Sequence, residues 1–211
     1  MDEKKILAKI DELDSYLEEL NNIMPGSLEE YETSIKDKRA CERLLQISIE
    51  VVLDIGNIIL SGLKLGLPSE EDEVFDKLSE KQIISKKGAV VLKEMKSFRN
   101  VLVHKYGIVN DELVFENLNR LNDFSDFKEE ILKYLKLRQK KEEIGKRILK
   151  LGDKQILELF DRMNIKLKNI SMKVAILEIR KIGAESANLG ILIDGAKSKE
   201  ELLKWIKSFE K

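Results

Sequence analysis

The sequence has 211 residues, of which 43% are hydrophobic and 36% are charged, and its formal net charge is −1. A nearly neutral chain is not a generic polyanion binder, and its single cysteine excludes an intrachain disulfide and a thiolate metal site. No run of about 18 apolar residues predicts a membrane span, and charged residues follow Met1. We therefore expect a soluble cytoplasmic protein that uses no metal and no cofactor.

The N-terminal third predicts two helices. Apolar residues at helical spacing favour a first helix over residues 3–21, which the sequence Met24-Pro25-Gly26 ends. Ser27 with Glu30 three residues later is a capping-box pattern. It predicts a long second helix from there to about Leu63.

Three further helices follow. Pro68 and Ser69 precede a short acidic helix expected over residues 70–79. A helix over 86–104 comes next, with Gly107 placed to terminate it. Asn110 can cap a helix that runs toward position 150, with a kink predicted at Asn122-Asp123.

Long helices with one apolar side and short connections predict an all-α fold, an antiparallel helical bundle. We expect this bundle to comprise residues 1–140 and to be followed by a C-terminal extension over 145–211. The extension is predicted to be mostly helical, with helices over 157–167 and from Ser198 onward. Residues 189–193 are compatible with a short buried strand, and an all-helical extension is the preferred interpretation.

The stretch from Ser97 to Tyr106 contains His104, the only histidine of the chain. On a helical wheel with about 100° per residue, an apolar stripe is predicted to face the core; its members are Val91, Met95, Phe98 and Leu102. Arg99 borders that stripe, whereas Asn100 and His104 lie on the opposite side. Val101 and Val103 are interleaved with these polar residues, which predicts that the second face is covered by another subunit.

Positive charge is concentrated around the same helix. Between Lys81 and Tyr106 there are seven basic residues and a single acid, Glu94. This excess can attract phosphate, with Lys96 and Lys105 as candidate contacts. The alternative is a solvated lysine-rich face.

A single histidine beside an arginine, with no set of metal ligands, fits the metal-independent cleavage of RNA. Histidine takes a proton from a ribose 2′-hydroxyl near neutral pH, and a guanidinium stabilises the charge on the phosphate. Asn100 lies one helical turn before His104 and can hydrogen-bond the imidazole or the substrate. Because cleavage uses both a base and an acid, one histidine per chain favours a symmetric dimer with two copies of Arg99 and His104 in one cleft.

The segment from Arg99 to Tyr106 resembles a known family. It matches the Arg-x4-His-x-Tyr motif of the HepT-like toxins, a branch of the HEPN ribonuclease superfamily. The sequence from Cys41 to Glu50 is similar to the long second helix of that family. The resemblance covers about residues 1–140, including the order and lengths of the helices.

This resemblance implies a HEPN helical bundle that forms a homodimer and acts as the ribonuclease toxin of a toxin–antitoxin pair. Arg99 and His104 would then be catalytic, with Asn100 supporting them. The implied partner is an MntA-like nucleotidyltransferase antitoxin that transfers AMP from ATP to Tyr106. Each AMP would place a bulky anion beside the RNA cleft and repel phosphate.

A second function remains open from the residues alone. The protein can be a non-catalytic dimeric helical module that binds a nucleotide or a nucleotidyltransferase partner. In that case the motif serves binding and not catalysis. Without the resemblance, a histidine such as His104 on a helix of an ordinary bundle is more often a structural hydrogen-bonding residue than a base. Three polar positions of the second helix, Glu50, Asp54 and Asn57, either line the cleft or are simply solvated, and the second interpretation is preferred.

Overall fold

The computed structural model describes residues 1–66, 68, 70–104, 110–150, 152 and 154, and for His104 and residues 141, 144, 145 and 147–150 it describes the backbone alone. The elements over these ranges are the helices α1 (Glu3–Ile23), α2 (Leu28–Thr33), α3 (Ile35–Gly62), α4 (Asp72–Glu80), α5 (Lys86–His104), α6 (Asp111–Leu118) and α7 (Asn122–Lys150). The expected all-α class is therefore confirmed.

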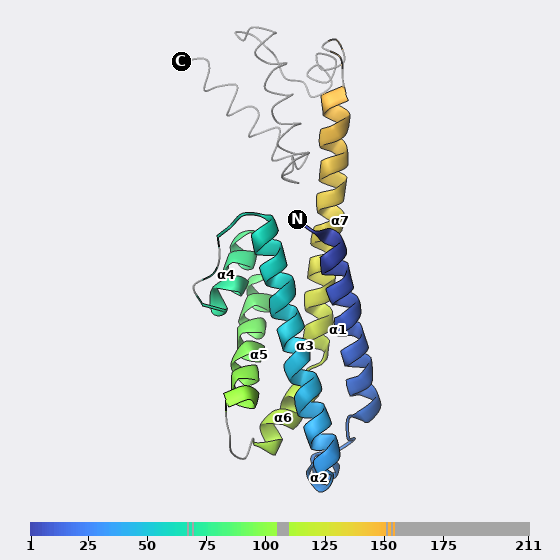
Figure 1. Ribbon diagram of the computed structural model, residues 1–211, viewed down its shortest axis with the longest axis vertical. Coiled ribbons are helices and arrows are strands. Elements are labelled where there is room, and N and C mark those ends of the chain that lie inside the picture. Colours follow the sequence, from blue (N-terminus) through green and yellow to red (C-terminus); the bar gives the residue numbers. More distant parts are fainter. Residues whose placement is uncertain (67, 69, 105–109, 151, 153, 155–211) are drawn as a thin grey trace. The chain divides into compact units, whose positions relative to one another are not determined.

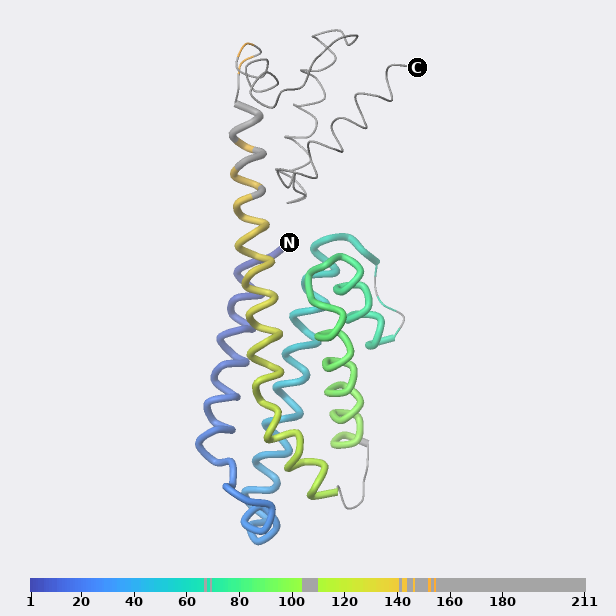
Figure 2. Tube along the Cα trace, turned by 180° about the vertical axis from the view of Figure 1, so that it is seen from behind, coloured from blue at the N-terminus to red at the C-terminus, as the bar shows by residue number. Residues whose placement is uncertain are grey.

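The chain divides into two compact units, Met1–Lys133 and Tyr134–Lys211. In the first unit, α1, α3, α5 and the first part of α7 run alternately down and up, as Figures 1 and 2 show. The short helices α2, α4 and α6 lie at the connections between them. This is the predicted antiparallel bundle. In the second unit α7 continues to Lys150, and the predictions for residues 157–167, 189–193 and 198 onward fall outside the described residues.

Helix α3 is the centre of the bundle, since it packs against α1, α2, α4, α5 and α6. By length and composition it could also cross a membrane, but 61% of its most apolar stretch is buried inside the protein. An amphipathic helix that exchanges this much surface for contacts with neighbouring helices is a core helix. Its position explains why its apolar content is so high.

The predicted single helix from Ser27 to Leu63 is wrong in one respect, because it is interrupted at Ser34 and forms two helices, α2 and α3. The Ser34 backbone is extended (φ −109°, ψ 99°), and its hydroxyl accepts a hydrogen bond from the Asp37 N–H at 3.3 Å. The first cap forms as predicted, with the Ser27 hydroxyl accepting from the Glu30 N–H at 3.2 Å. A serine side chain competes for backbone partners, so it can end one helix and begin the next.

We predicted a kink at Asn122-Asp123. The structure instead has two separate helices, and the interruption between them begins a few residues earlier. Helix α6 ends at Leu118, and the side-chain amide of Asn119 donates to the Phe115 carbonyl at 2.9 Å. Helix α7 then begins at Asn122. An asparagine that hydrogen-bonds the last turn satisfies carbonyls which would otherwise need a further turn of helix.

Helix α4 approaches α3 closely at Gly56. A Cβ atom at this position would lie 2.5 Å from Cγ1 of Val74, which is fully buried. Only glycine allows the two helices this separation. This contact holds the start of α4, and with it the preceding Glu71, against the C-terminal half of α3.

Candidate functional site

The motif residues occupy the last turns of α5. The buried residues of α5 recur at every third position and are Ala89, Leu92, Met95 and Phe98. This spacing turns the buried side gradually around the helix, as expected where a helix crosses its neighbours at an angle; α5 packs against both α3 and α4. These four residues form the buried seam of α5. The next position at this spacing is Val101, which is half-buried.

The wheel prediction is therefore correct only in part. Met95 and Phe98 are buried as expected, whereas Val91 and Leu102 are half-buried, and Leu92 takes the core position instead. Val101 and Val103, which we predicted to need a second subunit, are already half-buried within the chain. Part of the apolar surface of α5 remains exposed, with Val90 at 58%, and its coverage by a second subunit stays a prediction.

Arg99 lies with its guanidinium between polar groups of three helical segments. Its Nη1 donates to Asn100 Oδ1 at 3.1 Å, and its Nη2 donates to Glu71 Oε1 at 3.3 Å. Its Nε makes no hydrogen bond within the described part of the chain and lies 3.9 Å from Glu50 Oε1. Only 17% of the side chain is exposed, so the charge is held in a partly desolvated environment where its interactions are strengthened.

Two further ion pairs join α5 to α4. Lys96 Nζ lies 3.3 Å from Asp72 Oδ1, and Lys93 Nζ lies 2.5 Å from Asp76 Oδ1. Together with Arg99–Glu71 they form an acid–base ladder between the two helices. The three acids of this ladder offset part of the positive charge that we counted between Lys81 and Tyr106. They were not included in that count because they precede Lys81 in the sequence.

The three polar residues that the sequence singled out on α3, Glu50, Asp54 and Asn57, have different surroundings. Glu50 faces Arg99 and also accepts a hydrogen bond from Gln46 Nε2 at 2.9 Å. Asp54 pairs instead with Lys9 of α1 at 3.0 Å, and Asn57 is exposed. Within the part of the chain that the structure describes, Glu50 is the one of the three that lies beside Arg99.

Sequence reasoning missed Glu71. The signal was present, since an acidic helix directly precedes a basic one and short connections make successive helices neighbours. Opposite charges on adjacent antiparallel helices predict pairing across them.

His104 is the last residue of α5. The predicted roles of its side chain, and those of Lys105, Tyr106 and Gly107, lie outside the described residues. Among the side chains that the structure does describe, no group of three or more His, Cys, Asp or Glu residues has the geometry to hold a metal ion.

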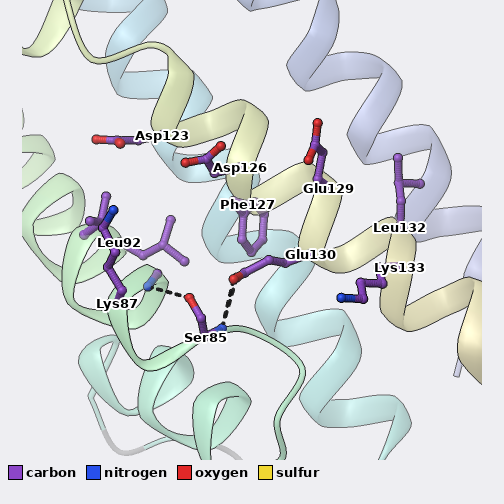
Figure 3. Close-up of a pocket in the computed structure, with 12 residues that line it drawn as sticks. Ser85, Lys87, Leu92, Asp123, Asp126, Phe127, Glu129, Glu130, Leu132 and Lys133 are labelled. Carbon is purple, nitrogen blue, oxygen red and sulfur yellow. Dashed lines mark hydrogen bonds between the residues drawn. The ribbon is translucent and has the colours of Figure 1, made fainter.

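A surface pocket of about 580 Å³ lies elsewhere in the first unit, between the start of α5 and α7. Figure 3 shows the Glu130 carboxylate at this helix start, where it accepts hydrogen bonds from the Ser85 N–H at 3.1 Å. The Ser85 hydroxyl in turn accepts from the Gly88 N–H at 2.9 Å. The helix N-terminus, an anion site in principle, is therefore already filled by a carboxylate of the protein.

The described helices form an antiparallel bundle in which Arg99 and Asn100 lie in the last turns of α5, shortly before His104. The chain belongs to the HepT-like ribonuclease family, whose model, Ribonuclease HepT-like, matches residues 13–162. The resemblance found in the motif is thereby confirmed.

Several relatives and solved structures are similar to the chain. The tRNA nuclease HepT of Aphanizomenon flos-aquae is 32% identical over 110 residues, which cover 52% of this chain and 75% of the relative. The mRNA nuclease HepT of Shewanella oneidensis is 32% identical over 84 residues, which cover 39% of this chain and 63% of that protein.

Among solved structures, the tri-AMPylated Shewanella oneidensis HEPN toxin in complex with MNT antitoxin has a TM-score of 0.57 and 25% identity, covering 61% of this chain and 96% of that one. The cytosolic protein YutE of Bacillus subtilis has a TM-score of 0.56 at 22% identity, covering 64% and 91%, and this likeness supports the fold alone.

Proposed function

We propose that the protein is a metal-independent endoribonuclease and the toxin of a HepT/MntA-type toxin–antitoxin pair, working in the cytoplasm. The observation that carries the proposal is the Arg99–Asn100 arrangement at the end of α5, directly before His104, in a chain of the HepT-like ribonuclease family. Residues 1–140 form the catalytic module in this proposal, and 145–211 form an extension.

The chemistry follows from the residue types. Neutral His104 removes the proton from a ribose 2′-hydroxyl, and the 2′-oxygen attacks the adjacent phosphorus. The bond from phosphorus to the 5′-oxygen breaks, and that oxygen takes a proton from the protonated His104 of a second protomer. The products are a 2′,3′-cyclic phosphate and a 5′-hydroxyl.

Arg99 has the role of stabilising the negative charge that builds on the non-bridging oxygens. Its partial burial strengthens that interaction, and the hydrogen bond to Asn100 fixes the plane of its guanidinium. Asn100 therefore supports catalysis in this proposal by orienting the arginine. Lys96 and Lys105 remain proposed phosphate contacts, although Lys96 is paired with Asp72 in the free chain.

Regulation follows from the family. We propose that an MntA-like nucleotidyltransferase AMPylates Tyr106, two residues after the histidine, and that the added phosphate blocks the cleft by bulk and by repulsion of RNA. The similar toxin from Shewanella oneidensis is tri-AMPylated and bound to an MNT antitoxin, which supports this part of the proposal.

The test is an RNA cleavage assay in EDTA with protein made without its antitoxin and shown by intact mass to be unmodified. Wild type should cleave, and both His104→Ala and Arg99→Ala should lose cleavage by about a hundredfold or more. Arg120→Ala is the matched control, because Arg120 is a surface arginine paired with Glu94 and Asp123. No cleavage of any RNA by verified unmodified protein would support the second candidate, a dimeric binding module.

The proposal that two protomers share one active site is tested by mixing wild-type protein with an inactive variant. Wild type is combined with increasing proportions of His104→Ala under conditions that exchange subunits, at constant total protein. If each cleavage needs a histidine from both protomers, activity falls with the square of the wild-type fraction. A linear fall would mean that each protomer works alone.

A further inference from the structure

The Arg99 guanidinium is already bound by carboxylates before any substrate arrives. Glu71 Oε1 accepts from its Nη2 at 3.3 Å, and Glu50 Oε1 lies 3.9 Å from its Nε. These two carboxylates come from different elements, since Glu50 belongs to α3 and Glu71 immediately precedes α4. A phosphate that reaches Arg99 has to share the guanidinium with them or replace one of them.

The two carboxylates are held to different degrees. Glu50 lies within the 28-residue α3, between the buried Ile49 and Val51, and its carboxylate has a second partner in Gln46. The two side chains are exposed to similar extents, 39% for Glu50 and 44% for Glu71, but the Glu71 carboxylate caps no backbone N–H group of α4. Glu71 is therefore the carboxylate that can leave.

A carboxylate and a phosphate are alternative ligands for the same guanidinium edge, because both present negatively charged oxygens at a spacing that matches its N–H groups. We propose that Glu71 occupies the position of an RNA phosphate at Arg99, so that it lowers the affinity of the free protein for RNA and leaves when RNA binds. This rests on the proposed function in one respect, namely that RNA is the ligand of this site.

The ladder supplies a matched control. Asp76 on α4 pairs with Lys93 on α5, and its side chain is exposed to an extent (52%) close to that of Glu71 (44%). Removing the charge of Asp76 changes the net charge by the same amount but leaves Arg99 unaltered. A neutral amide at either position keeps the shape of the side chain.

The experiment measures the binding of a 2′-O-methylated RNA, which cannot be cleaved through its 2′-oxygen, by fluorescence anisotropy at fixed ionic strength. Exposed ion pairs contribute up to about 1 kcal/mol, so Glu71→Gln should bind about 3- to 5-fold more tightly than wild type. Asp76→Asn should change the affinity by less than about 1.5-fold. In an Arg99→Ala background, at an ionic strength low enough for binding, Glu71→Gln should have no more effect than Asp76→Asn.

Four binding results would overturn the proposal. Equal effects of Glu71→Gln and Asp76→Asn would show a general charge effect, and weaker binding by Glu71→Gln would show that Glu71 orients Arg99 for RNA. A full effect in the Arg99→Ala background, or no binding of RNA by any variant, would also refute it. Cleavage of unmodified RNA is measured in parallel: binding as predicted without cleavage refutes only the ribonuclease, and cleavage without the Glu71 effect refutes only this inference.

Discussion

The contact between α3 and α4 at Gly56 predicts a specific response to a single methyl group. In Gly56→Ala the new Cβ would lie 2.5 Å from Cγ1 of Val74, whereas carbon atoms in contact are about 3.5–4.0 Å apart. Val74 is fully buried and stiff at χ1, so it cannot move aside. The helices have to separate by about 1 Å.

The free energies can be compared. Replacing glycine by alanine inside a helix stabilises it by about 1 kcal/mol, whereas overpacking a core costs about 1–3 kcal/mol. With an overlap this large, the cost should lie near the upper end. We expect Gly56→Ala to lower the free energy of unfolding by about 1–2 kcal/mol.

A double-mutant cycle read by urea denaturation isolates the cause. In a Val74→Ala background Cγ1 is absent, so the same Gly56→Ala change should stabilise the protein by about 1 kcal/mol. The coupling between the two positions is then about 2–3 kcal/mol. If Gly56→Ala stabilises the wild type as much as it stabilises the Val74→Ala protein, the packing argument is refuted.

Further predictions concern caps and ionisation. Ser34→Ala removes the cap of α3 and should cost about 1 kcal/mol in urea denaturation, whereas Ser34→Asn should keep the stability. Glu130→Ala leaves the Ser85 N–H without its acceptor and should cost about 1–2 kcal/mol by the same assay, and an unchanged midpoint would contradict the contact. Burial raises the pKa of the Cys41 thiol from 9.0 to about 11, so the unfolded thiol ionises first. Stability should therefore fall as the pH rises from about 9 to 11, and Cys41→Ala should lessen this fall.

The broad fold followed from the sequence because apolar spacing and helix-ending residues agree with each other. The first helix, for example, has Pro25 and Gly26 just beyond its end, and α5 begins at Lys86 and ends at His104 as predicted. The break at Ser34 was not predicted, and the break between α6 and α7 was predicted only as a kink, since one side chain that bonds to its local backbone barely alters an apolar pattern.

For the candidate site, the sequence named residues but did not predict their contacts. The motif gave Arg99 and Asn100, but the partners of the arginine are separated from it by 28 and 49 positions in the sequence. The direction of the buried seam on α5 depends on the crossing of helices, which a wheel drawn for one helix does not contain. That is why Leu92 was missed as a core residue of α5.

The most direct test of the central claim is the identity of the RNA ends produced in EDTA. Unmodified wild-type protein should yield 2′,3′-cyclic phosphate and 5′-hydroxyl ends, should not cleave the same RNA when it is 2′-O-methylated, and should lose this activity in His104→Ala. Cleavage of the methylated RNA, 5′-phosphate ends, or equal activity in His104→Ala would contradict the account.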